Sequence, residues 1–168
     1  SGTSWANLAA GATASSLTEN FDGVTAPALP AGWSTSTLAG AANPWVTRTT
    51  TPDSAPNAAF AAILGSVSDS VLVSPTIAVP AGVSQLTFQH LYDMASTYNG
   101  GVLEVRIGAG AFQDILAAGG SFVSGGYTAT LRTGSNPLGG RQAWTGNPGG
   151  YVTTVVNLPA AAAGQNIV

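Results

Sequence analysis

The chain contains no cysteine and no lysine, and each absence removes a class of function. Without cysteine it forms no disulfide, no thiolate metal site and no cysteine nucleophile. Its only cations are four arginines, set against seven acidic residues, and the net charge is -3. That balance provides neither the basic patch that nucleic acid requires nor a polybasic membrane contact. No run reaches the roughly 18 apolar residues of a membrane span, so membrane insertion is not expected either.

Charge of either sign is scarce. Charged residues make up 7% of the 168 residues, whereas hydrophobic residues make up 45%, so the chain can bury a core. Serine, threonine, asparagine, alanine and glycine must then form most of the surface. This composition suits an extracellular bacterial protein that is stable without disulfides, and it predicts an extracellular or cell-surface location. Residues 1–16 do not resemble a signal peptide, which a mature secreted chain would have lost.

The spacing of the prolines and of the short apolar runs between them predicts an all-β fold. Ten prolines break any long helix, and the runs between them are short and rich in Val, Ile, Thr and Phe. Residues 83–93 and 101–107 alternate in polarity as half-buried strands do, and 70–79 and 150–158 also read as strands. Only the alanine-rich stretches 57–64 and 160–164 are compatible with a helix, and the second could carry one turn. We expect residues 18–168 to form one sandwich domain and residues 1–17 to form an N-terminal arm or linker.

The segment "GAGAFQ" (108–113) poses a choice between a phosphate loop and a hairpin turn. It has two glycines of a dinucleotide fingerprint, but Gln113 stands at the third position and a strand, not a helix, follows. We therefore predict that Gly108 or Gly110 adopts a positive φ in a hairpin joining 102–107 to 111–116.

Catalytic residue types are scarce. His90, the only histidine, lies on the apolar face of a predicted strand beside Phe88 and Tyr92, and a buried or half-buried structural role is expected for it. No nucleophile motif accompanies it. The acidic residues stand mostly at turns or on polar strand faces, so a hydrolytic carboxylate pair is not favoured. The sequence thus predicts that the chain is not an enzyme.

Aromatic side chains are the best candidates for ligand contacts. Three tryptophans in Pro/Gly/Asn-rich contexts and one tyrosine could stack on a sugar or anchor a protein, and they are Trp33, Trp45, Trp144 and Tyr127. The competing interpretation is that each tryptophan closes the edge of the core.

A cofactor is not expected, with calcium as the alternative. Calcium prefers oxygen ligands in loops, and the segments "TENFDG" (18–23) and "YDMASTYNGG" (92–101) supply them. The candidate ligands are Asp22, Asp93 and Asn99. Neither segment has the ligand density of an EF-hand loop.

Several separated motifs resemble one family. "ENFDGVTAPALPAGW" (19–33), "LTFQHLYD" (86–93), "YNGGVLEVRIGAGAFQDI" (98–115) and "NPLGGRQAWTGNPGGY" (136–151) are similar, in this order, to secreted bacterial jelly-roll modules of the choice-of-anchor J type. The cleaved-adhesin and MAM-like domains are more distant relatives. The resemblance implies a jelly-roll β-sandwich of two antiparallel sheets in a non-catalytic surface module. Some relatives bind calcium, but Asn99 and "MAS" (94–96) replace acidic residues that such a site would use.

The resemblance also suggests that the chain stops inside a strand at Val168. An incomplete last strand would leave an open edge, and the N-terminal arm with Trp5 and Leu8 could then pair with a neighbouring copy. We therefore expect an adhesion or structural module whose partner is a protein or glycan of the cell surface. The alternatives are a subunit of a self-assembling extracellular filament and a carbohydrate-binding module.

Overall fold

The chain is described by a computed structural model, which covers residues 3–7, 17–134 and 136–168. Within these ranges the protein is all-β and has no α-helix, which confirms the predicted fold class. A single turn of 3-10 helix, η1 (Ala160–Ala162), forms in the second alanine-rich stretch, whereas the first, residues 57–64, contains a strand at Ala58–Phe60 and no helix. The described part of the chain has no helix long and apolar enough to cross a membrane.

Fifteen strands alternate with turns along the described chain. In order they are β1 (Thr3–Asn7), β2 (Thr18–Glu19), β3 (Ser34–Gly40), β4 (Val46–Arg48), β5 (Ala58–Phe60), β6 (Ser68–Val73), β7 (Ile77–Ala78), β8 (Ser84–His90), β9 (Glu104–Val105), β10 (Gln113–Asp114), β11 (Ser121–Ser124), β12 (Ala129–Thr130), β13 (Gln142–Ala143), β14 (Val152–Asn157) and β15 (Asn166–Ile167).

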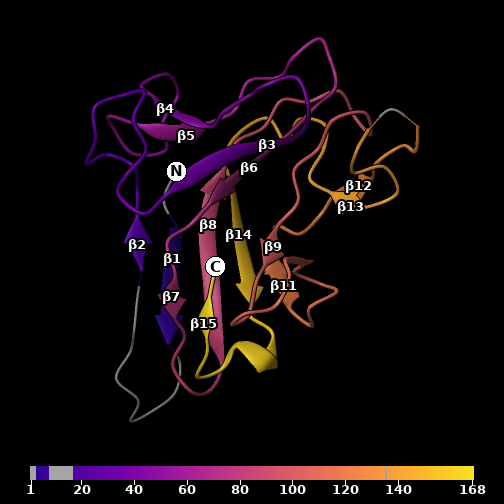
Figure 1. Ribbon diagram of the computed structural model, residues 1–168. Helices are drawn as coiled ribbons and strands as arrows, with labels where there is room; N and C mark the ends of the chain where they lie inside the picture. Colours follow the sequence, from indigo (N-terminus) through magenta and orange to yellow (C-terminus); the bar gives the residue numbers. More distant parts are fainter. Residues whose placement is uncertain (1–2, 8–16, 135) are drawn as a thin grey trace.

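These strands form one five-stranded antiparallel sheet and five two-stranded pairs. The large sheet has the order β11-β14-β8-β1-β2, and the pairs are β3/β6, β4/β5, β7/β15, β9/β10 and β12/β13. The strand predicted at 83–93 is β8, which lies at the centre of the large sheet beside β14 (Figure 1). Two continuous sheets were expected. The structure instead divides the smaller strands into short pairs, because glycines and prolines interrupt the chain every few residues.

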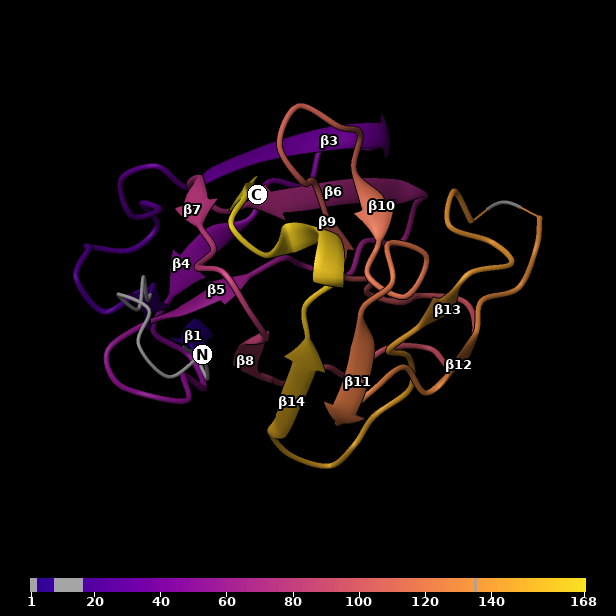
Figure 2. The ribbon, with the colours of Figure 1, turned by 90° about the horizontal axis from the view of Figure 1, so that it is seen from below.

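The core lies between the large sheet and the smaller strands. Leu86 of β8 and Val156 of β14 come from the large sheet, and they pack in one cluster with Ile77 of β7, Val105 of β9 and Ile167 of β15. Figure 2 shows β8, β14 and β11 on one side and β7, β9 and the C-terminal segment on the other. Burial of this apolar cluster joins the two layers across a sandwich-like interior.

Residues 3–7 were assigned to the N-terminal arm, but they form β1 inside the large sheet. β1 pairs with β8 over five residues, with Trp5 opposite Leu86, and it pairs with β2 through Thr3 and Ser4. The second anchor predicted for the arm, Leu8, lies outside the described residues. The backbone of β1 therefore covers the edge that β8 would otherwise present.

The C-terminal residues are paired on both sides, in contrast to the open edge expected at Val168. β15 pairs with β7, and Ile167 also bridges to Ile107. The backbones of Arg106 and Val168 exchange hydrogen bonds of 2.9 and 3.0 Å. The apolar side chain of Ile167 is fully buried here, which gives this short strand a place in the core.

The glycine hairpin is confirmed. β9 and β10 pair antiparallel, and Gly108 in the connecting turn has a φ of 56°. A Cβ at Gly108 would meet only the Gln165 side chain at 4.0 Å, so the backbone conformation, and not lack of space, favours glycine there.

Replacing Gly108 with valine should therefore lower the free energy of unfolding by about 1–2 kcal/mol, because a β-branched residue is strained at positive φ. Urea denaturation of the variant measures this loss. The matched control is Ala109→Val in the same exposed turn, where no positive φ is involved and little change is expected. Equal losses in the two variants would refute the conformational explanation.

Candidate functional site

Trp144, predicted as a ligand contact, is part of the core. Only 5% of the residue is exposed, and its indole N–H donates to the carbonyl oxygen of Gly125 at 2.8 Å. Its ring lies at 4.8 Å from those of His90 and Tyr127 and at 5.6 Å from those of Phe88 and Phe122. The interpretation that this tryptophan closes the core is thus confirmed, and no ring face is free for a sugar.

His90 is a half-buried structural residue, as expected. Its Nε2 lies 2.9 Å from Thr154 Oγ1, and Thr154 Oγ1 in turn lies 2.7 Å from the carbonyl oxygen of Gly125. The carbonyl only accepts, so the threonine proton goes to Gly125 and His90 Nε2 donates to Thr154. Burial of the ring lowers the pKa of His90 to about 4. The imidazole is therefore neutral, with its proton on Nε2.

This environment predicts a stability loss in mild acid. The unfolded chain takes up a proton on His90 near its ordinary pKa of 6.5, whereas the folded chain does so only near 4. Stability should be complete above about pH 6.5 and should fall by about 1–2 kcal/mol as the pH drops to 4, allowing for partial solvation of the ring. Urea denaturation across this range measures the loss. The pH profile of His90→Gln should lack this component, and an unchanged profile would contradict the assignment.

Trp33 and Trp45 are half-buried and anchored to the fold. The Trp33 ring packs edge-on against the buried Phe21 at 5.0 Å. The Trp45 indole N–H lies 3.4 Å from the carbonyl oxygen of Ser70, and its backbone N–H donates to Thr35 Oγ1 at 2.9 Å. Both rings thus pack against the fold, and part of each residue remains accessible to solvent.

Tyr127 belongs to a half-buried polar cluster that joins two hairpins. Its hydroxyl accepts a hydrogen bond from the backbone N–H of Leu103 at 2.9 Å and lies 3.0 Å from a carboxylate oxygen of Asp114. Burial, with a contribution from Asp114, raises the pKa of the Tyr127 hydroxyl, so it stays protonated. Arg141 completes the cluster with ion pairs to Glu104 at 2.6 Å and to Asp114 at 3.0 Å. The cluster ties the β9/β10 hairpin to the segment that enters β13.

The predicted calcium ligands form no acidic cluster in the described part of the chain. Both carboxylate oxygens of Asp22 already accept hydrogen bonds, from Asn20, Ser54 and the backbone of Asn57. Asp93 is exposed, and the Asn99 carbonyl oxygen accepts from Thr145 at 2.6 Å. No group of three or more acidic or histidine side chains in the described ranges is placed to hold a cation.

We expect that a chelator changes the stability little, because a cation at Asp22 would have to displace its hydrogen-bond donors. The melting temperature in EDTA should match that in excess calcium within about 2 °C, which is less than the shift that 1 kcal/mol produces. A larger drop that calcium restores would show that backbone and amide oxygens form a site.

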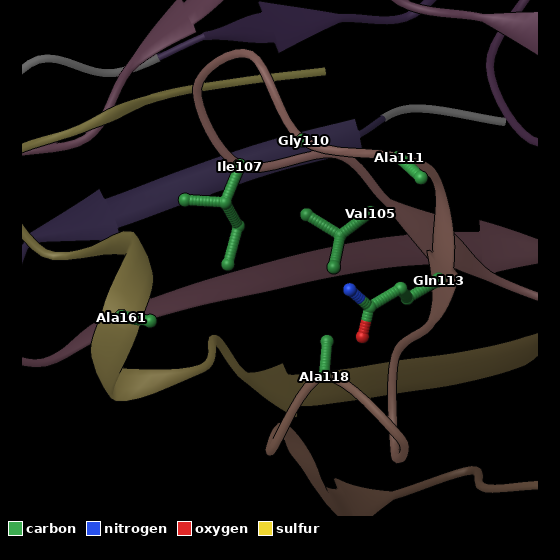
Figure 3. Close-up of a pocket in the computed structure, with 7 residues that line it drawn as sticks. All are labelled: Val105, Ile107, Gly110, Ala111, Gln113, Ala118 and Ala161. Carbon is green, nitrogen blue, oxygen red and sulfur yellow. The ribbon is translucent and has the colours of Figure 1, made fainter.

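A small cavity of about 160 Å³ lies between the β9/β10 hairpin and η1 (Figure 3). Alanine and aliphatic side chains line most of it, including Val105, Ile107, Ala118 and Ala161. Gln113 supplies the only polar side chain and points toward it from β10. The cavity lacks a charged group, so it offers packing space and little chemistry.

Among the described residues, Tyr98 is the most exposed aromatic residue, and it was not among the ligand contacts predicted from the sequence. Tyr98 is 58% exposed, and the guanidinium carbon of the exposed Arg132 lies 4.4 Å from the centroid of its ring. Arg132 Nη1 also donates to the Tyr98 hydroxyl. We call this pair the Tyr98–Arg132 platform. Nothing in the sequence pairs these residues, because they are 34 positions apart and each stands in a loop.

Hydrogen bonds hold the platform in place from both loops. The backbone N–H of Arg132 donates to the Thr97 carbonyl oxygen at 2.9 Å, and the side chain of Asn136 donates to the Tyr98 carbonyl oxygen at 2.7 Å. The backbone N–H of Thr97 donates to the hydroxyl oxygen of the buried Thr145 at 2.8 Å. The exposed ring is therefore presented from a fixed backbone.

Comparison of the chain with protein-family models, with curated proteins and with solved structures finds no match.

Proposed function

We propose that the chain is a non-catalytic module of the bacterial cell exterior, with a jelly-roll β-sandwich fold, that adheres to a glycan or protein of the cell surface. The observation that carries this proposal is the Tyr98–Arg132 platform, an exposed aromatic ring fixed by hydrogen bonds from two loops. Fixed aromatic rings contribute strongly to binding because little side-chain entropy is lost when a ligand docks.

The bonding of the half-buried titratable groups supports a non-catalytic role. His90 is neutral and donates to Thr154, and Arg141 is shared between Glu104 and Asp114. A general base or nucleophile needs a reactive partner within hydrogen-bond reach, whereas these groups are bonded to structural partners. They join strands and hairpins, so their placement is explained by stability alone.

A glycan array tests adhesion through the platform. The chain should bind a restricted class of glycans, and Tyr98→Ala should abolish that binding while leaving the denaturation curve unchanged, because the ring is mostly exposed. The matched control is Phe112→Ala, which removes a 41% exposed ring that stacks on Arg106 in the β9/β10 turn. Absence of any binding that depends on Tyr98 would overturn the proposal for glycans, and a cell-surface protein would remain the ligand class to test.

A filament subunit is the second candidate, and β1 is the observation that favours it. β1 lies between β8 and β2 in the large sheet and pairs with both through its backbone. The position between β8 and β2 of a neighbouring copy could accept β1 in place of that copy's own strand. Exchange of an identical element between copies is a low-cost route to assembly.

Cysteine pairs can distinguish the two arrangements, because the natural chain has no cysteine. Ser4 lies opposite Thr87 in the β1/β8 register, so Ser4→Cys combined with Thr87→Cys should form a disulfide across this pair. Filament assembly by strand exchange predicts a ladder of covalent oligomers on a non-reducing gel. A cross-linked monomer alone would refute exchange.

A further inference from the structure

We propose that the Tyr98–Arg132 platform binds a saccharide that carries a carboxylate, with the sugar ring against the aromatic ring and the carboxylate on the guanidinium. This inference rests on the proposed adhesive function and names the ligand class of its site.

Arg132 has the free hydrogen-bond donors that such a ligand needs. Among the described residues both ion pairs belong to Arg141, and Arg132 has no acidic partner. One of its five N–H donors is used by the Tyr98 hydroxyl, and the residue is exposed. Arg48 and Arg106 also stack on aromatic rings without an acidic partner among the described residues, but of the three stacked arginines only Arg132 also donates to the hydroxyl of its ring.

The backbone beneath Tyr98 is strained, although the ring that it positions adds little to the core. Thr97 has a φ of 65°, in the left-handed region that a β-branched residue rarely adopts. Strain of this kind costs about 1–3 kcal/mol and concentrates at binding sites. Hydrogen bonds from Thr97 to Thr145 and from Arg132 to Thr97 hold the turn. The chain thus maintains a costly conformation that displays Tyr98 to solvent.

Close packing at the following glycine fixes the same turn. A Cβ at Gly100 would lie 2.8 Å from Leu131 Cδ2 and 2.9 Å from Ala143 Cβ, so only glycine allows the turn to lie this close to the β12/β13 hairpin. Leu131 immediately precedes Arg132 in the chain. The contact therefore sets the position of Tyr98 relative to Arg132, which is how a preorganised site is built.

The two side chains together specify the ligand chemistry. A tyrosine face packs against the C–H groups of a sugar ring, and a guanidinium fork matches the two oxygens of a carboxylate. A neutral sugar would use the ring only. A fatty acid would need an apolar cavity for its chain. Neither Tyr98 nor Arg132 lines the small cavity described above, so the platform offers no such space.

Matched pairs of acidic and neutral oligosaccharides test the assignment, since a carboxylate can come from a uronic or a sialic acid. The probes are trigalacturonic acid against its methyl ester, and sialyllactose against lactose, titrated by calorimetry. We expect at least one acid to bind at least tenfold more tightly than its neutral counterpart. Equal affinity within every pair that binds, or no binding by either acid, would overturn the inference.

Variants separate the roles of the two residues. Arg132→Met should weaken binding of the acid at least tenfold and leave the neutral sugar unaffected, and Arg132→Lys should restore only part of the loss because it keeps the charge without the fork. Arg106→Met is the matched control, since Arg106 also stacks on an exposed ring, at 4.9 Å from Phe112. An unchanged affinity in Arg132→Met overturns the carboxylate inference. Neutral glycans that bind in a Tyr98-dependent manner would still support the proposed adhesive function.

Discussion

Replacing Trp144 with alanine should lower the free energy of unfolding by about 3–5 kcal/mol, the range for truncating a large buried aromatic residue. The substitution removes a ring that contacts four other aromatic rings, and it leaves the Gly125 carbonyl oxygen without its indole donor. Because this loss is a large part of the stability of a single domain, the variant should melt far below the natural chain. Urea denaturation followed by circular dichroism measures the difference.

Trp45→Ala is the matched control for this experiment. Trp45 is half-buried, and its indole N–H makes a longer bond of 3.4 Å, so a loss of about 1–2 kcal/mol is expected. A loss below about 1 kcal/mol for Trp144→Ala would show that Trp144 is not a core residue and would return it to the candidate ligand contacts.

Arg141→Met should lower the free energy of unfolding by about 2–3 kcal/mol, less than the cost of breaking a fully buried pair. The side chains of Glu104 and Asp114 are 29% and 19% exposed, so the substitution would leave two partly buried carboxylates without a cation to pair with. The loss of these ion pairs should also weaken the contact between the β9/β10 hairpin and the segment that enters β13. Urea denaturation measures the stability, and hydrogen exchange at the Leu103 and Ile115 amides reports on the hairpin.

Two further variants test the electrostatic origin of that loss. Arg132→Met removes an exposed arginine without an ion pair among the described residues, and it should change stability by less than about 0.5 kcal/mol. Adding Glu104→Gln and Asp114→Asn to Arg141→Met should recover part of the loss, because the uncompensated charges are then absent. If neutralising the acids recovers nothing, lost packing and not charge explains the effect.

Sequence patterns predicted individual strands and turns well. The alternation of residues 83–93 predicted β8, and the run 150–158 predicted β14, because a two-residue period of polarity has one structural explanation on a half-buried sheet. The two glycines of "GAG" predicted a turn for a similar reason, since few residues other than glycine accept a positive φ. The role of His90 followed from its apolar neighbours on the same strand.

Contacts between residues far apart in the chain were predicted poorly. Trp33, Trp45 and Trp144 stand in similar Pro/Gly/Asn-rich contexts, yet of these three only Trp144 is buried in the core, because its burial depends on rings from β8 and β11 and on Tyr127. The Tyr98–Arg132 platform was missed for the same reason. Its two loops meet only after the turn at Gly100 packs against Leu131, a contact that no local pattern encodes.

The sequence by itself therefore determined the all-β class, the central strands and, because it has no cysteine, the absence of disulfides. Those conclusions rest on composition and on periods of two residues, which are local properties. The tertiary structure alone decided that Thr3–Asn7 enters the large sheet, that Asn166–Val168 is paired on both sides, and that Tyr98 meets Arg132. Pairing and stacking between distant segments depend on the free energy of the whole packed chain, so a short stretch of sequence carries no separate signal for them.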